Sequence, residues 1–166
     1  MKDKFKEYLE GASRPTRLRA LTVKSYKNVD RSLDDRDTNS ELATLGDALL
    51  KYALSELLFE AEVENITVEK KKYETDRVLV EVIAKHYHLL KYIRYDQGNR
   101  SIPRTYRYCE KPGNDSPHKY IATTVEALLA AIYLDHGKYG GDGIRLVFEI
   151  VRSWKSLVDK SRNAKA

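Results

Sequence analysis

Residues 39–50 read Asn-Ser-Glu-Leu-Ala-Thr-Leu-Gly-Asp-Ala-Leu-Leu, and this stretch decides the fold of the chain. Its apolar residues continue downstream at helical spacing, at Leu42, Leu45, Leu49, Ala53 and Leu57. This period predicts one long helix, capped by Asn39 or Ser40 and ending near Glu60.

The middle of this predicted helix holds two residues that an ordinary apolar helix would avoid. Gly46 costs about 1 kcal/mol relative to alanine, which indicates that another part of the chain packs very close to it. Asp47 stands among leucine and alanine, where a carboxylate is unfavourable unless water, a cation or a metal satisfies it. A second stretch, Ile121 to Asp135, repeats the arrangement with Glu126 among small and apolar residues. Two helices that each carry one inward carboxylate predict a metal site.

The rest of the chain favours helices joined by polar loops. Further helices are expected at Lys4 to Glu10, Arg17 to Tyr26, Glu74 to Tyr95, Ile121 to Asp135 and Asp142 to Leu157. Residues 28–38 and 96–119 are expected to be loops, and Lys70 to Lys72 a solvated connector. Alternating strand patterns are scarce, so an all-α fold is predicted.

The composition fits one soluble domain. The 166 residues suffice for a single core, and 42% apolar with 33% charged residues are typical of a globular protein. No apolar run approaches the roughly 20 residues of a membrane span, so no membrane partner is expected. The single Cys109 excludes an internal disulfide framework and a paired-cysteine zinc site. A reducing, cytoplasmic compartment is expected.

Positive charge is concentrated in two places, although the formal net charge is only +5. Residues 91–120 hold seven Lys or Arg against three Asp or Glu, and residues 151–166 hold five against one. A basic loop and a basic tail on an otherwise acidic body suit a polyanionic partner. The alternative is a solvated loop and a solubilising tail.

Three segments resemble the signatures of one family, the ribonuclease III catalytic domain. Residues 39–50 match the frame of the family motif Asn-Glu-Arg-Leu-Glu-Phe-Leu-Gly-Asp-Ala-Val-Leu without a gap. Residues 20–26, Ala-Leu-Thr-Val-Lys-Ser-Tyr, resemble the upstream Ala-Leu-Thr-His-Arg-Ser-Tyr element. Residues 125–135, Val-Glu-Ala-Leu-Leu-Ala-Ala-Ile-Tyr-Leu-Asp, are similar to the second signature. The three come in the family's order and span most of the chain.

The resemblance implies a single helical domain over residues 1–166, with a motif-bearing core at about 17–157 and no double-stranded-RNA-binding domain. It implies a homodimer formed through the helices of residues 39–50. It also implies Mg²⁺-dependent cleavage of double-stranded RNA, with Mn²⁺ as a substitute ion and 5′-phosphate and 3′-hydroxyl ends as products. Asp47 and Glu126 would be the catalytic, metal-binding residues. Ribosomal RNA maturation, on a ribosomal precursor or with a helper protein, is the function that the family favours.

The chain departs from the family pattern at four positions. Family enzymes usually bring four carboxylates to the metals, but two of those positions hold Ala43 and Thr123. A further family glutamate is Ser40, and Thr44 replaces the aromatic residue that inserts into the partner subunit. The four-carboxylate site is therefore absent.

Two interpretations remain open. In the first, the chain is an active nuclease of the compact Mini-ribonuclease III type, which it resembles at Ala-x-x-Gly-Asp (43–47) and Ala-Thr-x-x-Glu (122–126). In the second, it is a catalytically degenerate domain that binds structured RNA or a ribosomal particle without cleaving. Mg²⁺ can be held by one or two carboxylates together with phosphate oxygens. Gly46 would let the helices approach, and Thr123 would orient a water. Lys51, four residues after Asp47, offers a purely structural ion pair instead.

The basic loop is the expected RNA contact. Arg100, Arg104, Arg107 and Lys111 alternate with Tyr106 and Tyr108, a pattern suited to phosphate contacts beside a groove. A-form RNA is recognised mainly by shape, so little sequence readout is expected. The two tyrosines also fit a simpler role, packing the loop onto the helices.

Overall fold

The computed structural model describes residues 3–110, 116–137 and 141–164. Within these ranges the only β-type pairing is an isolated bridge between Thr22 and Arg94, so the all-α prediction is confirmed. The α-helices are α1 (Lys4–Glu10), α2 (Pro15–Ala20), α3 (Ser40–Glu60), α4 (Ile66–Glu74), α5 (Asp76–Val78), α6 (Lys119–Asp135) and α7 (Gly143–Asn163). Shorter 3₁₀ turns are η1 (Lys24–Asn28), η2 (Asp35–Asp37) and η4 (Leu89–Lys91), and η3 (Leu79–Ala84) is a π-helix.

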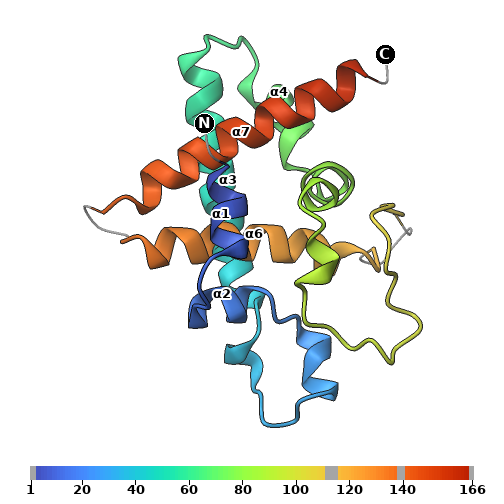
Figure 1. Ribbon diagram of the computed structural model, residues 1–166. Coiled ribbons are helices and arrows are strands. Elements are labelled where there is room, and N and C mark those ends of the chain that lie inside the picture. The colour runs from blue at the N-terminus through green and yellow to red at the C-terminus, as the bar shows by residue number, and fades with distance from the viewer. Residues whose placement is uncertain (1–2, 111–115, 138–140, 165–166) are drawn as a thin grey trace.

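The crossing of α3 and α6 forms the centre of the molecule. Figure 1 shows α6 running across the middle with α3 behind it, while α7 crosses above, α1 lies in front and α2 lies below α6. Both central helices bury long aliphatic side chains at helical spacing, including Leu50, Leu54, Leu58, Leu128, Leu129 and Ile132. Burial of this apolar surface is the main stabilising contribution to the fold. The helices predicted around residues 40–60 and 121–135 are thus confirmed.

The N-terminal helix is held by a cap and by aromatic packing. The Asp3 carboxylate accepts the backbone N–H groups of Phe5 and Lys6, both at 3.1 Å, which begins α1 at the predicted residue. Phe5 is fully buried and meets the rings of Tyr87 and Trp154 edge-on at 4.6 and 5.0 Å. These contacts fix α1 against α7 and the segment that follows η3.

The predicted helix from Arg17 to Tyr26 is wrong in its second half. α2 ends at Ala20, because the next residues pair with a distant strand-like segment. The Val23 N–H donates to the Arg94 carbonyl at 3.0 Å, and the Arg94 N–H donates to the Leu21 carbonyl at 2.7 Å. Asn39 occupies the cap position of α3, but its side chain makes no cap bond and donates to the Ala20 carbonyl at 3.3 Å instead.

The predicted single helix from Glu74 to Tyr95 is also wrong. α4 already covers residues 66–74, so Lys70 to Lys72 are helical and not a connector. The backbone of Thr75 is extended, and its side chain caps the short α5. The chain then passes through the π-helix η3, and His88 adopts a left-handed conformation with φ of 52°. The apolar period continues through these breaks, which is why the sequence conceals them.

No helix in the described ranges is both long enough and apolar enough to cross a lipid bilayer.

Candidate functional site

Gly46 is the point of closest approach between the two central helices. A Cβ atom at Gly46 would lie only 1.8 Å from the Glu126 carbonyl oxygen, so the α3 backbone is in direct contact with α6 at this position. The close packing predicted from the mid-helix glycine is confirmed. Ala130, one turn further along α6, is fully buried. Because Asp47 follows Gly46 directly, this contact brings the Asp47 and Glu126 side chains to one place.

Glu126 is in an environment that disfavours its charge. Burial raises the pKa of the Glu126 carboxyl to about 7, and the negative charges of Asp47 and Asp76 add to the effect. Desolvation and neighbouring carboxylates both favour the protonated form of a carboxyl group. A cation placed between these carboxylates would relieve both penalties.

Asp47 already has a partner on its own helix. Its Oδ2 atom lies 2.7 Å from the Lys51 Nζ atom, and the Asp47 and Lys51 side chains are 36% and 48% exposed. The ion pair that the sequence offered as a structural alternative is therefore present. Exposed i,i+4 pairs contribute about 0.3–0.5 kcal/mol, so this pair is a weak reason for retaining either residue.

Both carboxylates open onto a cleft of about 380 Å³ between α3, α4, α5 and α6. Its other lining residues are Lys51, Lys71, Glu74, Thr75, Asp76, Arg77, Tyr108 and Glu110. Glu74 and Asp76 are members of the site that were not predicted from the sequence. Glu74 ends α4, a helix that was not predicted from the sequence, and Asp76 begins α5. No spacing relates either residue to the signature motifs.

The cleft is acidic but does not form a closed metal cage. In the described ranges, no group of three or more His, Cys, Asp or Glu side chains converges in ligand geometry. Ala43 is buried without a polar atom in its side chain, and Thr123 is not among the residues that line the cleft. Mg²⁺ often keeps several waters and takes only one or two carboxylates besides phosphate oxygens. Asp47 and Glu126 fit such an ion, because their mutual repulsion is what a divalent cation offsets.

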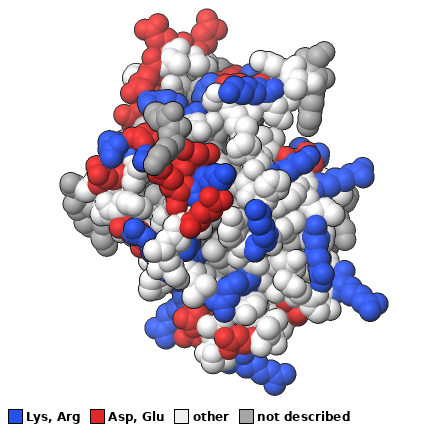
Figure 2. Space-filling view, viewed as in Figure 1, with Lys and Arg blue, Asp and Glu red and all other residues white. Residues whose placement is uncertain are grey.

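Arg100, Arg104 and Arg107, predicted to contact RNA, are not among the residues that line this cleft. Arg100, Arg104 and Arg107 are exposed, and the Arg104 guanidinium donates to the Gln97 carbonyl. Lys111 lies outside the described residues. On the face drawn in Figure 2, basic side chains predominate toward the right, where Figure 1 shows the loop, and acidic ones gather toward the upper left.

The two loop tyrosines have packing roles. The Tyr106 hydroxyl accepts the Leu90 N–H at 2.9 Å, and the Tyr108 N–H donates to the Glu81 carboxylate at 3.0 Å. Since Tyr108 also lines the acidic cleft, these bonds fix the second half of the loop at its edge. The loop therefore brings Tyr108 and Glu110 to the cleft, while Arg100, Arg104 and Arg107 do not line it.

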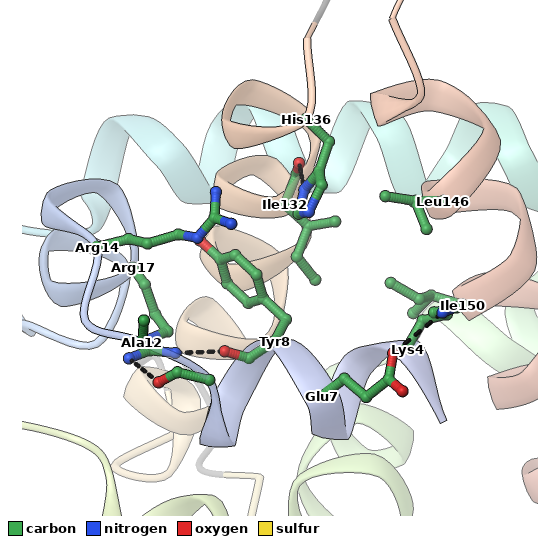
Figure 3. A pocket seen from close by; sticks show the side chains of 11 residues that line it. Lys4, Glu7, Tyr8, Ala12, Arg14, Arg17, Ile132, His136, Leu146 and Ile150 are labelled. Atoms are coloured by element: carbon green, nitrogen blue, oxygen red, sulfur yellow. Dashed lines mark hydrogen bonds and ion pairs between the residues drawn. The ribbon is translucent and has the colours of Figure 1, made fainter. Parts of the chain in front are cut away.

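Another hollow, of about 270 Å³, lies between α1, α2, α6 and α7 and is shown in Figure 3. Its cations are already engaged. The Arg17 guanidinium donates to the Tyr8 carbonyl and, at 3.0 Å, to the Gly11 carbonyl. Lys4 pairs with Glu7 at 3.0 Å, and the floor is apolar, with Ile132 and Ile150. These bonds hold α1 in place, and Glu7 is the single carboxylate in the described lining of this hollow.

Comparison with known proteins connects this geometry to one family. A family model described as "Ribonuclease-III-like" matches residues 15–142. Ribonuclease 3 of Clostridium acetobutylicum is 33% identical over 124 residues, which are 71% of this chain and 47% of that protein. Ribonuclease 3 of Natranaerobius thermophilus is 31% identical over 153 residues, 87% of this chain and 58% of that protein. The chain thus spans about half the length of these relatives.

Solved structures support the same fold. A crystal structure of the nuclease domain of ribonuclease III from Campylobacter jejuni superposes with a TM-score of 0.66 at 19% identity, over 97% of each chain. A second structure of that domain, described for flexibility in a region involved in dimer formation, gives a TM-score of 0.65 at 18% identity over 92% of this chain and 95% of that one.

Proposed function

We propose a function for this chain from one premise: the chain belongs to the ribonuclease-III-like family. The proposed activity is endonucleolytic cleavage of double-stranded RNA in the cytoplasm, with residues 17–157 as the catalytic core. The observation that carries it is the contact of Gly46 with the Glu126 backbone, which places the Asp47 and Glu126 carboxylates on one acidic cleft. Nothing in an ordinary helix crossing requires two carboxylates at its closest point.

Asp47 and Glu126 are the residues that would hold a divalent cation, Mg²⁺ in the proposal. The ion, when bound, supplies an activated water and positive charge for the phosphate under attack. The protein contributes the fixed positions of the two carboxylates. The α3–α6 contact fixes both carboxylates on rigid helices, and the burial of Glu126 makes its carboxylate a strong electrostatic partner for a cation. Arg100 and Arg107, which are exposed on the basic loop, bind phosphates along the duplex.

The reaction is the hydrolysis of a phosphodiester. A water oxygen forms a bond to phosphorus and loses a proton, the bond to the 3′-oxygen breaks, and that oxygen takes up a proton. The products carry a 5′-phosphate and a 3′-hydroxyl.

We propose that two copies of the chain form a homodimer through the exposed face of α3, where Thr44 is exposed. The two sites of such a dimer would cut both strands of the duplex. Light scattering that finds a monomer at high concentration would contradict the dimer. A ribosomal RNA precursor, with or without a helper protein, is the substrate we favour.

A second candidate function is RNA binding without cleavage. It is favoured by Ala43 and Thr123 at family carboxylate positions and by the 2.7 Å ion pair of Lys51 with Asp47, which already neutralises one of the two remaining carboxylates. In this alternative the fold and the basic loop would be retained for binding structured RNA alone.

The experiment that separates the two is cleavage of a labelled duplex RNA with Mg²⁺ or Mn²⁺. Wild type is compared with Asp47→Asn and Glu126→Gln, and duplex binding is measured for all three. Cleavage by the wild type that both substitutions abolish, with binding retained, supports the nuclease. Binding without cleavage by the wild type supports the second candidate and overturns the first.

A further inference from the structure

Lys51 places an ammonium group directly in the acidic cleft. It lies one turn after Asp47 on α3, with its Nζ atom 2.7 Å from the Asp47 Oδ2 atom. Glu74 and Glu126 line the same cleft as Lys51 and Asp47. Three carboxylates, from α3, α4 and α6, therefore surround the space into which this ammonium projects. That is the electrostatic situation of a bound cation.

The two central helices bring few negative charges to the cleft. The carboxylates of α3 and α6 that line it are Asp47 and Glu126, and α3 adds the Lys51 ammonium one turn after Asp47. Each divalent ion must be offset by negatively charged ligands, so a centre with two such carboxylates holds few ions. One fixed ammonium supplies the positive charge that a second ion would otherwise bring.

Two other cations around the cleft have carboxylate partners different from Asp47 and Glu126. The Arg77 guanidinium lies 3.8 Å from both the Glu81 and the Glu110 carboxylates, and the Lys70 Nζ atom lies 3.9 Å from Glu74. Lys71 lines the cleft without a described bond to Asp47 or Glu126. Of the cations that line the cleft, Lys51 is thus the one with a described bond to one of the two proposed metal ligands. Its side chain is 48% exposed, so the ammonium can turn from Asp47 to an incoming phosphate.

We propose that Lys51 is a resident cation of this centre, which stands in for one metal ion and contacts a non-bridging oxygen of the scissile phosphate when RNA is bound. The second half of the proposal rests on the proposed nuclease function, and the first half does not. Lys51 is then a catalytic residue, because a fixed positive charge at that oxygen stabilises the negative charge that develops during hydrolysis. The ammonium also competes with a divalent ion for Asp47 in the protein without RNA.

The test compares Lys51→Gln and Lys51→Arg with wild type and with Lys4→Gln. Lys4 is a matched control, because it pairs with Glu7 at 3.0 Å on the surface of α1, away from the cleft. Binding of Mn²⁺ to the RNA-free protein is measured by electron paramagnetic resonance. Single-turnover cleavage of duplex RNA is then measured at saturating Mn²⁺.

If Lys51 is a resident cation, Lys51→Gln binds Mn²⁺ about 3- to 10-fold more tightly than wild type, because the ammonium no longer competes with the ion for Asp47. It also predicts cleavage about 10- to 100-fold slower at saturating Mn²⁺, with much of the rate kept by Lys51→Arg and all of it by Lys4→Gln. An unchanged Mn²⁺ affinity in Lys51→Gln would contradict the proposal that Lys51 is a resident cation. Tighter Mn²⁺ binding with wild-type cleavage would overturn the phosphate contact alone.

The two proposals fail in different ways. If the wild type does not cleave, the nuclease function and the phosphate contact are both wrong. The Mn²⁺ titration still tests whether Lys51 is a resident cation, since the titration needs neither RNA nor turnover.

Discussion

Glu126 holds a carboxyl group where burial and two neighbouring carboxylates disfavour its ionised form, and this has a consequence for stability. Its pKa is raised to about 7 in the folded chain, against 4.5 for an ordinary glutamate. The folded state therefore binds the proton more tightly than the unfolded state. The resulting stabilisation is complete below about pH 4.5 and is lost as the pH rises through about 7.

We predict that Glu126→Gln removes this pH dependence. At pH 8 the variant should be more stable than wild type by about 1–3 kcal/mol, and near pH 4.5 the two should be nearly equal. Urea unfolding at a series of pH values measures the difference. Glu7→Gln, a change at an exposed glutamate on α1, is the control and should follow wild type throughout. A wild type whose stability does not fall between pH 5 and 8 relative to Glu126→Gln would contradict the assigned environment.

At the scale of elements, the contact of α3 with α6 depends on the absence of a side chain at Gly46. We predict that Gly46→Ala destabilises the fold by about 3 kcal/mol or more, because the new Cβ would meet the Glu126 carbonyl at 1.8 Å and the helices must separate. The same change at Gly98 is the control, since its Cβ would meet only the Asp96 side chain, at 3.3 Å. Thermal unfolding of both variants gives the comparison. Equal effects would mean that the crossing is not the fixed contact described here.

The elements also show which features of the fold can be predicted from the sequence. α3 and α6 were predictable because each carries apolar residues at helical spacing over a long stretch. Each also holds one carboxylate among these apolar residues, Asp47 in α3 and Glu126 in α6. The breaks after Glu74 and at His88 were not, because apolar residues continue at helical spacing while the backbone changes conformation. Local sequence carries little signal for a π-turn or for a single left-handed residue.

The site was predictable to the same extent as its helices. Gly46, Asp47 and Glu126 stood out as exceptions within regular helices, and the structure places them together. Asp76 and Glu74 gave no such signal, since their place in the cleft follows from how α4 and α5 fold back against α3 and α6. The role of Lys51 was visible only as an alternative, because an i,i+4 pair has the same spacing whether it is structural or catalytic.

At the scale of the whole molecule, we propose that the basic loop binds the RNA and that the acidic cleft cleaves it. We predict that the double substitution Arg100→Gln with Arg107→Gln weakens duplex RNA binding and lowers the slope of log affinity against log salt by about 1.5, since two phosphate contacts are lost. Binding is measured in EDTA to prevent cleavage. Arg145→Gln on α7, where the arginine pairs with Asp142 and Glu149, is the control. An unchanged slope in the double variant would remove the loop from the RNA interface.

The central claim is that Asp47 and Glu126 form one cation-binding centre, and its most direct test is a Mn²⁺ titration of four proteins by electron paramagnetic resonance. These are wild type, Asp47→Asn, Glu126→Gln and the double variant, each checked for fold by circular dichroism. We predict saturable binding to wild type, a loss of at least about tenfold in each single variant, and little further loss in the double variant, because both carboxylates serve the same ion. Wild type without saturable binding, or losses that simply add, would contradict the account.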